Sequence, residues 1–182
     1  MYYVGLNKRL KNIQHHSLFF DVPFEEHGKE IYKKPQWPTD PLFYTSIASA
    51  TDPSVAPEGC ENIVFLVPVA SGLEGDTEEL REKYFQMIVR RMEHHIGESI
   101  MDSISYKKMY SVSDFAQDYN SFRGNAYGLA NTLSQTSGFR PASRSKKVKN
   151  LFYTGQLTVP GPGVPPSLIS GEVVATEINH LY

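Results

Sequence analysis

A run of glycines and prolines near the end of the chain limits its fold more than any other stretch. Residues 160–166 read PGPGVPP, between a short apolar run at 151–153 and a helix-like stretch that begins at Pro165 and Pro166. Proline fixes φ and lacks an N–H, whereas glycine permits backbone conformations closed to other residues. Proline is tolerated in the first helical turn because its missing N–H would have no partner within the helix. The pattern therefore predicts a strand, a tight turn and a helix that starts at the prolines.

This connection is of a kind that can bring a ligand to a helix N-terminus. Unpaired N–H groups and the positive end of the helix dipole favour an anion or an electron-rich carbonyl there. Because the prolines donate nothing, we expect the N–H groups of Gly161, Gly163 and Val164 to be the ones presented. An ordinary connector between a strand and a helix is the alternative, and the residues alone leave both interpretations open.

Five stretches rich in β-branched and aromatic residues predict strands, and one periodic stretch predicts a long helix. The helix is expected at 76–96, with Asp76 or Thr77 as its cap and Gly97 after its end. Its apolar residues recur at three-four spacing, so we expect that stripe to face the core. We expect a mixed sheet with helices packed on it, followed by a separate α/β piece. The expected strands are 2–6, 13–20, 42–48, 63–70 and 104–112.

Charge and composition argue against several classes of protein. The chain has 18 basic and 20 acidic residues, which predicts no nucleic-acid partner because such proteins carry a strongly basic face. Cys60 is the one cysteine, so a disulfide framework within the chain is excluded and the cytoplasm is the expected location. No apolar run approaches the roughly 18 residues of a membrane-spanning helix. Attachment to a membrane surface stays open.

Three polar features are candidates for a functional site. Histidine pairs stand at 15–16 and 94–95, but adjacent residues on a strand or helix do not converge, so we expect no metal site. The five basic residues within 140–149 are expected to form a solvated loop, with contact to phosphate or anionic lipid as the alternative. Cys60 has no identifiable base partner. The catalytic residues are therefore unknown.

The glycine–proline stretch also carries a family resemblance. Residues 153–171, YTGQLTVPGPGVPPSLISG, closely resemble the C-terminal signature of the bacterial-type phytoene desaturases, flavin-dependent enzymes of the carotenoid desaturase family. Further segments resemble the family in the same order, so the similarity covers essentially all 182 residues. These segments are Tyr3-x-Gly5-Leu6, the histidines at 15–16 followed by Phe19-Phe20, TDPS at 51–54 with APEG at 56–59, 62–69, and RGN at 123–125 with Gly128-Leu129.

The resemblance implies an α/β flavoprotein with an amine-oxidase-like fold. Residues 1–135 would be part of the substrate-binding domain, whose sheet walls a long apolar tunnel. Residues 136–149 would be a connecting loop, and 150–182 the last strand and helix of the FAD-binding domain. The family's G-x-G-x-x-G fingerprint is absent, since the one G-x-G here is Gly161-Pro162-Gly163. We therefore expect the C-terminal portion of such an enzyme, inactive alone, with the N-terminal half of the FAD site missing.

The resemblance also implies a reaction, in which an isoprenoid polyene such as phytoene is oxidised by hydride transfer to flavin in carotenoid biosynthesis. Such a hydrocarbon dissolves only in lipid, so we expect a cytoplasmic protein attached peripherally to a membrane. Two alternatives stay open. One is a related polyene isomerase or saturase, and the other is a cofactor-free lipid-binding accessory module.

Within the family likeness, the turn acquires cofactor-binding roles. Gly155 would let the backbone approach the FAD, and Gln156 stands where many flavoproteins carry an aspartate for the ribityl hydroxyls. Gly161 and Gly163 would let the loop bend. The Val164 N–H would point toward flavin N1 and O2, where negative charge develops on reduction.

Overall fold

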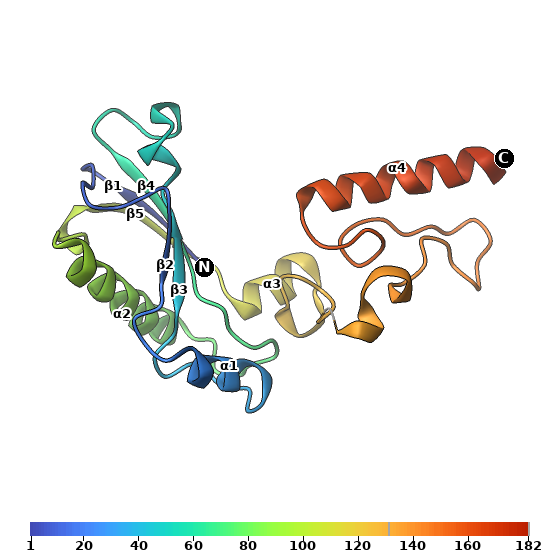
Figure 1. Cartoon of the computed structure of the whole chain (residues 1–182), viewed down its shortest axis with the longest axis horizontal. Helices are drawn as coiled ribbons and strands as arrows, with labels where there is room; N and C mark the ends of the chain where they lie inside the picture. Colours follow the sequence, from blue (N-terminus) through green and yellow to red (C-terminus); the bar gives the residue numbers. More distant parts are fainter. Residues whose placement is uncertain (131, 182) are drawn as a thin grey trace. The chain divides into compact units, whose positions relative to one another are not determined.

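The computed structural model describes residues 1–130 and 132–181, which form two compact units, Met1–Asn125 and Ala126–Tyr182 (Figure 1). The first unit holds a five-stranded sheet and three α-helices, and the second holds one α-helix. The strands are β1 (Tyr2–Leu6), β2 (His16–Phe19), β3 (Phe43–Ser46), β4 (Glu61–Leu66) and β5 (Ile104–Met109). The helices are α1 (Phe24–Tyr32), α2 (Glu78–Ile96), α3 (Val112–Tyr119) and α4 (Val164–Leu181).

The sheet has the strand order β2-β3-β4-β1-β5, and every neighbouring pair is antiparallel. The expectation of a mixed sheet is corrected here. Strands β4 and β5 do run in the same direction, and α2 connects them, but β1 lies between them and pairs with both. Inserting β1 converts what would be a parallel pair into two antiparallel pairs. The combination of a sheet with packed helices is confirmed.

All five predicted strands are present. Strand β1 has the predicted bounds, and the other four differ from the prediction at one or both ends. The predicted strand at 104–112 extends three residues too far, because Ser111 caps α3 instead of continuing β5. The Ser111 side chain and the Asp114 carboxylate form a reciprocal capping box that satisfies N–H groups at the start of the helix.

Helix α2 confirms the predicted long helix. The Thr77 hydroxyl accepts the Leu80 N–H at 3.2 Å, and Gly97 ends the helix with φ of 72°. Asp76 accepts two hydrogen bonds from the Arg81 guanidinium at 2.8 and 2.9 Å, and two more from Ser113. Burial favours the neutral acid, but these bonds outweigh it and lower the pKa of Asp76 to about 2.

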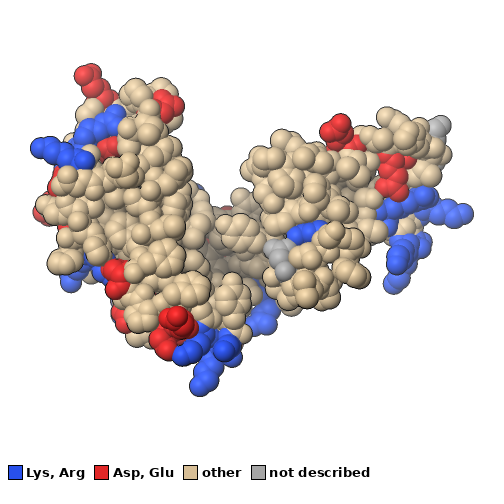
Figure 2. Space-filling model, in the orientation of Figure 1, with Lys and Arg blue, Asp and Glu red and all other residues tan. Residues whose placement is uncertain are grey.

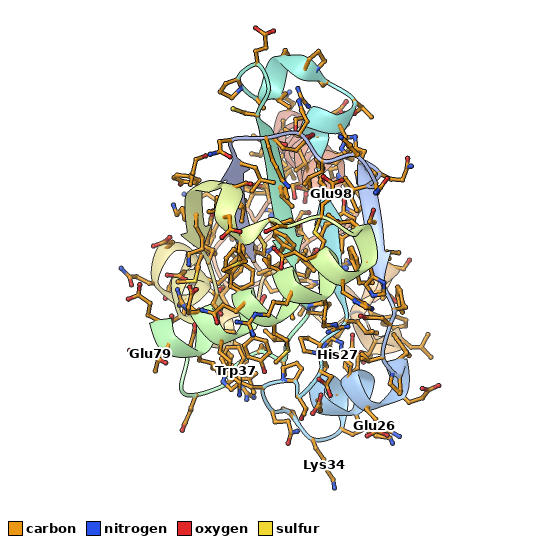
Figure 3. All side chains as sticks on the ribbon, turned by 90° about the vertical axis from the view of Figure 1, so that its left-hand side faces the viewer. Glu26, His27, Lys34, Trp37, Glu79 and Glu98 are labelled. Carbon is orange, nitrogen blue, oxygen red and sulfur yellow. The ribbon has the colours of Figure 1, made fainter. Side chains whose placement is uncertain are left out.

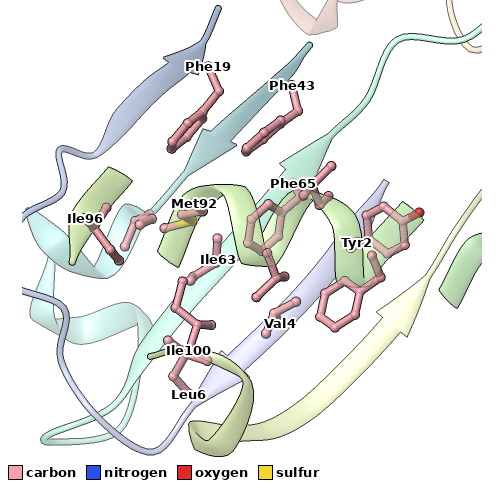
Figure 4. Packing of buried hydrophobic residues seen from close by; sticks show 14 of the residues in the cluster. Tyr2, Val4, Leu6, Phe19, Phe43, Ile63, Phe65, Met92, Ile96 and Ile100 are labelled. Carbon is pink, nitrogen blue, oxygen red and sulfur yellow. The ribbon is translucent and has the colours of Figure 1, made fainter. Parts of the chain in front are cut away.

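The core of the first unit lies between α2 and one face of the sheet (Figure 4). Ile88, Val89 and Met92 of α2 are fully buried, as is Phe65 of β4. The predicted core-facing stripe is therefore confirmed at Tyr84, Ile88, Met92 and Ile96, whereas Met87 of the same stripe is only half-buried. Strand residues of this face alternate with residues of the opposite face, as the two-residue period of a strand requires.

Helix α1 has no counterpart among the elements predicted from the sequence. Its only buried residue is His27, which links α1 to two other segments (Figure 3). The His27 Nδ1 accepts the Leu42 N–H at 3.1 Å, and its Nε2 lies 2.9 Å from the Pro68 carbonyl oxygen. Because the helix is nine residues long and carries Gly28 in its middle, it gives a weak sequence signal.

The second unit is mostly irregular up to α4. The strand predicted at 151–153 is present only as a single antiparallel bridge between Phe152 and Arg144. In the described chain, its pairing with the segment around Arg144 does not extend into a ladder. Among the described residues of this unit, Val174 is the one large apolar side chain in the buried class. No helix in the described part of the chain is long and apolar enough to cross a membrane.

Candidate functional site

The glycine–proline turn runs from Gly155 to the start of α4 at Val164 and is held by polar bonds at its first residue. The Gly155 N–H donates to the Ser170 hydroxyl at 2.7 Å, and that hydroxyl donates to the Ser167 carbonyl at 2.6 Å. The buried Thr158 donates to the Gly155 carbonyl through both its N–H and its hydroxyl, at 3.1 and 2.9 Å. Gly155 is therefore tied to α4, and its backbone position is set by two side chains.

The glycines of the turn adopt backbone conformations that side chains disfavour. Gly155, Gly161 and Gly163 have φ of 105°, 141° and 113°, and such angles are strained for other residues. A Cβ on Gly155 would meet nothing within 4 Å in the described chain. There is thus open space over the backbone at this position, as an approaching cofactor requires.

The far end of the turn presents backbone donors. The Gly163 carbonyl accepts the Ser167 N–H at 3.0 Å, so Gly163 precedes the first turn of α4. Pro165 and Pro166 occupy that turn, as predicted. The N–H groups of Gly161, Gly163 and Val164 donate to no group within residues 1–130 and 132–181. Gly161 is buried, which corrects the expectation that its N–H is presented. Gly163 and Val164 are exposed at the positive end of an 18-residue helix, which suits a polar, electron-rich ligand edge.

Gln156 has part of its hydrogen-bonding capacity in use. Its side-chain Nε2 donates to the backbone carbonyl of Ala126 at 3.4 Å. Its backbone carbonyl accepts a hydrogen bond from Arg140 at 3.1 Å. The side-chain oxygen Oε1 remains as an acceptor that a hydroxyl donor could use. The structure therefore places all five predicted site residues in one turn, with Gly155 and Gln156 at one end and Val164 at the other.

The basic run beyond Phe139 divides into two environments. Arg140 is buried, which corrects the expectation that it lies in a solvated loop. The three lysines are exposed as expected, and Figure 2 shows the basic side chains of this unit gathered mainly at one end of it. The three exposed lysines are Lys146, Lys147 and Lys149.

Sequence reasoning missed three residues that hold the turn: Thr158, Ser170 and Arg140. Ser170 lies inside a helix that is otherwise rich in apolar residues. A small hydroxyl residue at such a position hydrogen-bonds neighbouring backbone, and that was the available signal. Nothing in the sequence distinguishes Arg140 from the basic residues that follow it, because its burial depends on how the loop folds.

The second candidate surface is the sheet face opposite α2. None of its side chains is buried in residues 1–125, all of which are described. Pairing places Tyr3 beside Val64, and Tyr44 beside both Leu18 and Leu66. Gly5 gives Tyr106 room on this face, since a Cβ there would lie 3.3 Å from the Tyr106 Cβ. The face therefore carries a group of apolar and aromatic side chains, with polar residues such as Ser46 and Asn62 beside them.

A histidine pair borders this face at β2. The His15 and His16 rings stack with centroids 4.1 Å apart, and His16 Nδ1 lies 2.6 Å from the Tyr44 hydroxyl. His15 Nδ1 lies 2.7 Å from the Thr51 hydroxyl. No group of three or more His, Cys, Asp or Glu side chains in the described chain could hold a metal ion.

The chain belongs to the family of flavin containing amine oxidoreductases, whose family model matches residues 16–179. It is 42% identical to the carotenoid 3,4-desaturase of Haloarcula japonica over 95% of this chain and 35% of that protein. It is 33% identical to the zeta-carotene-forming phytoene desaturase of Myxococcus xanthus over 98% of this chain and 35% of that protein. The chain thus spans about a third of the length of the curated relatives that it matches.

Proposed function

We propose that the chain is the C-terminal part of an FAD-dependent carotenoid desaturase that oxidises an isoprenoid polyene of the phytoene type. The observation that carries this proposal is the turn before α4, with its open glycine and the two presented N–H groups of Gly163 and Val164, in a chain of the flavin containing family. The relatives named above, which act on carotenoids or phytoene by their names, support the substrate class.

The residues of the turn fit one end of an FAD molecule. Gly155 leaves room for the cofactor, and Gln156 offers its Oε1 to a ribityl hydroxyl. The N–H groups of Gly163 and Val164 would bind the electron-rich edge of the flavin ring. When bound, flavin supplies the electron sink for substrate oxidation. The chain contributes fixed donors, which stabilise negative charge without reorganisation at the moment of reaction.

The sheet face opposite α2 suits a hydrocarbon substrate. A polyene offers almost no hydrogen-bonding group, so its recognition depends on apolar contact area. Tyr3, Tyr44, Val64 and Leu66 supply such area from three neighbouring strands. Under the proposal, residues 1–135 belong to the substrate-binding domain, 136–149 connect the domains and 150–182 belong to the FAD-binding domain. The N-terminal half of the FAD site would come from a part of the protein outside this chain.

Peripheral attachment to a membrane from the cytoplasm is part of the proposal, because the substrate resides in lipid. A mouth that touches the bilayer would let the polyene enter the protein without crossing water. Flotation of the full-length protein with liposomes checks this point: we expect it to float with the vesicles and to be released by detergent.

Product analysis in cells that make phytoene tests the reaction. We expect the full-length protein to convert phytoene, or a carotenoid made from it, into a product with more conjugated double bonds and absorption at longer wavelength. An isomer with the same number of double bonds would instead identify an isomerase, and a product with fewer would identify a saturase. Unchanged carotenoids would contradict all three.

Cofactor content tests the fragment interpretation. We expect the 182-residue chain, expressed alone, to purify without stoichiometric flavin, because half a binding site cannot offset the entropy lost on binding. The full-length protein should purify yellow. A yellow preparation of the chain alone with about one FAD per chain would contradict the missing half-site. A full-length protein that binds lipid and no flavin would point to the lipid-binding module instead.

A further inference from the structure

Arg140 is a buried arginine next to the glycine–proline turn. Its exposed fraction is 8%, although it begins a run of basic residues whose lysines are exposed. Burying a guanidinium group is costly unless hydrogen bonds compensate for the lost water. A buried arginine in a unit with few buried side chains therefore calls for a structural or functional reason.

The Arg140 guanidinium contacts the turn at two places. Its Nη1 donates to the Gln156 carbonyl at 3.1 Å, which joins positions 16 residues apart in sequence. It also lies directly against Gly161, where an added Cβ would come within 3.2 to 3.3 Å of Cζ, Nη2 and Nε. The planar group thus holds the backbone at Gln156 and fills the space beside Gly161.

The contact with Gly161 gives that glycine a further role. From the sequence, we expect Gly161 to let the loop bend and to present its N–H group, and its φ of 141° agrees with the first of these roles. The structure adds that Gly161 is buried and admits the guanidinium where a side chain would stand. The missing side chain of Gly161 therefore leaves the space that the Arg140 guanidinium occupies.

We propose that Arg140 is a positioning residue that fixes the backbone of the turn in the conformation that presents the N–H groups of Gly163 and Val164. It acts through Gln156 and Gly161 and not by contact with the cofactor. Arginine suits this role because its planar fork can donate in one direction while its face packs against a backbone without a side chain. The inference rests on the proposed function, since the ligand of the turn is FAD.

The test compares substitutions at Arg140 and Arg144 in the full-length protein, with FAD affinity as the readout. We expect Arg140→Met to raise the dissociation constant of FAD by about tenfold or more, the scale of a lost hydrogen bond to a charged group. Arg140→Lys should recover less than half of that loss on a logarithmic scale, because the lysine keeps the charge and lacks the fork. Arg144→Met is the matched control, since Arg144 bonds Lys149 and stacks on Phe152 outside the turn. It should leave the affinity at the wild-type value.

A double-mutant cycle between positions 140 and 161 separates positioning from general destabilisation. Gly161→Ala should weaken FAD binding at least about threefold more in the wild type than in an Arg140→Ala background, where the space beside residue 161 is empty. Additive losses, or wild-type affinity in Arg140→Met, would overturn the inference. If the wild-type protein binds no FAD, the proposed function fails. The same cycle measured by thermal unfolding then decides whether the contact between Arg140 and Gly161 holds the turn: coupling supports it, and additivity overturns it.

Discussion

The two units of the chain are stabilised in different ways. The first unit buries a continuous apolar cluster between α2 and the sheet, with Ile88, Val89 and Phe65 fully excluded from water. The second unit buries Val174 but otherwise mainly polar groups, among them Arg140 and Ser170. The first unit therefore has the core expected of a self-sufficient fold, whereas the second relies on hydrogen bonds around one turn.

The second unit also leaves much of the apolar surface of α4 exposed. Val164 and Leu168 of α4 are 75% and 73% exposed, and Ile169 and Val173 are 46% and 45% exposed. Contiguous apolar surface on a helix usually marks a contact with another part of a protein. Under the proposed function, this surface packs against the remainder of the FAD-binding domain. The predictions below test whether the units differ as this comparison requires.

The largest effect is expected in the core of the first unit. Ile88→Ala should lower the free energy of unfolding by about 2–4 kcal/mol, because it leaves a cavity at a fully buried position. Ile88→Asp should abolish soluble expression, since a carboxylate there has no partner. Urea unfolding and the soluble yield measure the two changes. A soluble Ile88→Asp variant that only loses liposome binding would mean that the stripe contacts membrane instead.

The next largest effect concerns the turn of the second unit. In the full-length protein, Gly163→Val should lose FAD or activity, because φ of 113° is closed to a β-branched residue. A Cβ there would also lie 3.3 Å from Pro166 Cδ. Circular dichroism should remain as in the wild type, since the core of the first unit is untouched. FAD binding and desaturation at wild-type rates would show that the turn is a connector.

The elements with repeating apolar patterns were predictable from the sequence, and the polar contacts were not. Strand β1 is predicted by the alternation of its apolar residues, and helix α2 by their three-four spacing, because each element buries one face. The turn was predictable because glycine and proline act on the local backbone. Arg140 could not be placed, since its burial depends on a fold that brings it to Gly161. The antiparallel sheet followed from the insertion of β1 between β4 and β5, and local patterns carry no information about strand order.

A pH-dependent effect is expected from Asp76 of the first unit. Its pKa of about 2 in the folded state lies below its usual value of 3.8. The hydrogen bonds from Arg81 and Ser113 therefore stabilise the folded state above the unfolded pKa, and this contribution is lost as pH falls toward 2. Asp76→Asn should lower the free energy of unfolding at pH 7, and the difference should shrink below about pH 4. Urea unfolding at several pH values measures it, and a constant difference down to pH 2 would contradict the assignment.

A smaller effect is expected from the Gln156 side chain. In the full-length protein, Gln156→Ala should weaken FAD binding by roughly 1–2 kcal/mol, the scale of one lost hydrogen bond with its partner left unpaired. The substitution does not remove the backbone carbonyl of residue 156, to which Arg140 donates. Fluorescence titration of the apoprotein with FAD gives the change. An unchanged affinity would mean that Oε1 does not bind the cofactor.

The smallest effect is expected at Leu168, and its dependence on context tests the comparison directly. In the 182-residue chain this side chain is 73% exposed, so Leu168→Ala should change the free energy of unfolding by less than about 0.5 kcal/mol. In the full-length protein the same substitution should cost about 2 kcal/mol or more if α4 packs against the remaining part of the FAD-binding domain. The exposed Leu133, at 91%, offers a second position outside α4 for the same pair of measurements. A small cost at Leu168 in both contexts would mean that this face of α4 stays uncovered, and the apolar surface of the second unit would then need a different partner.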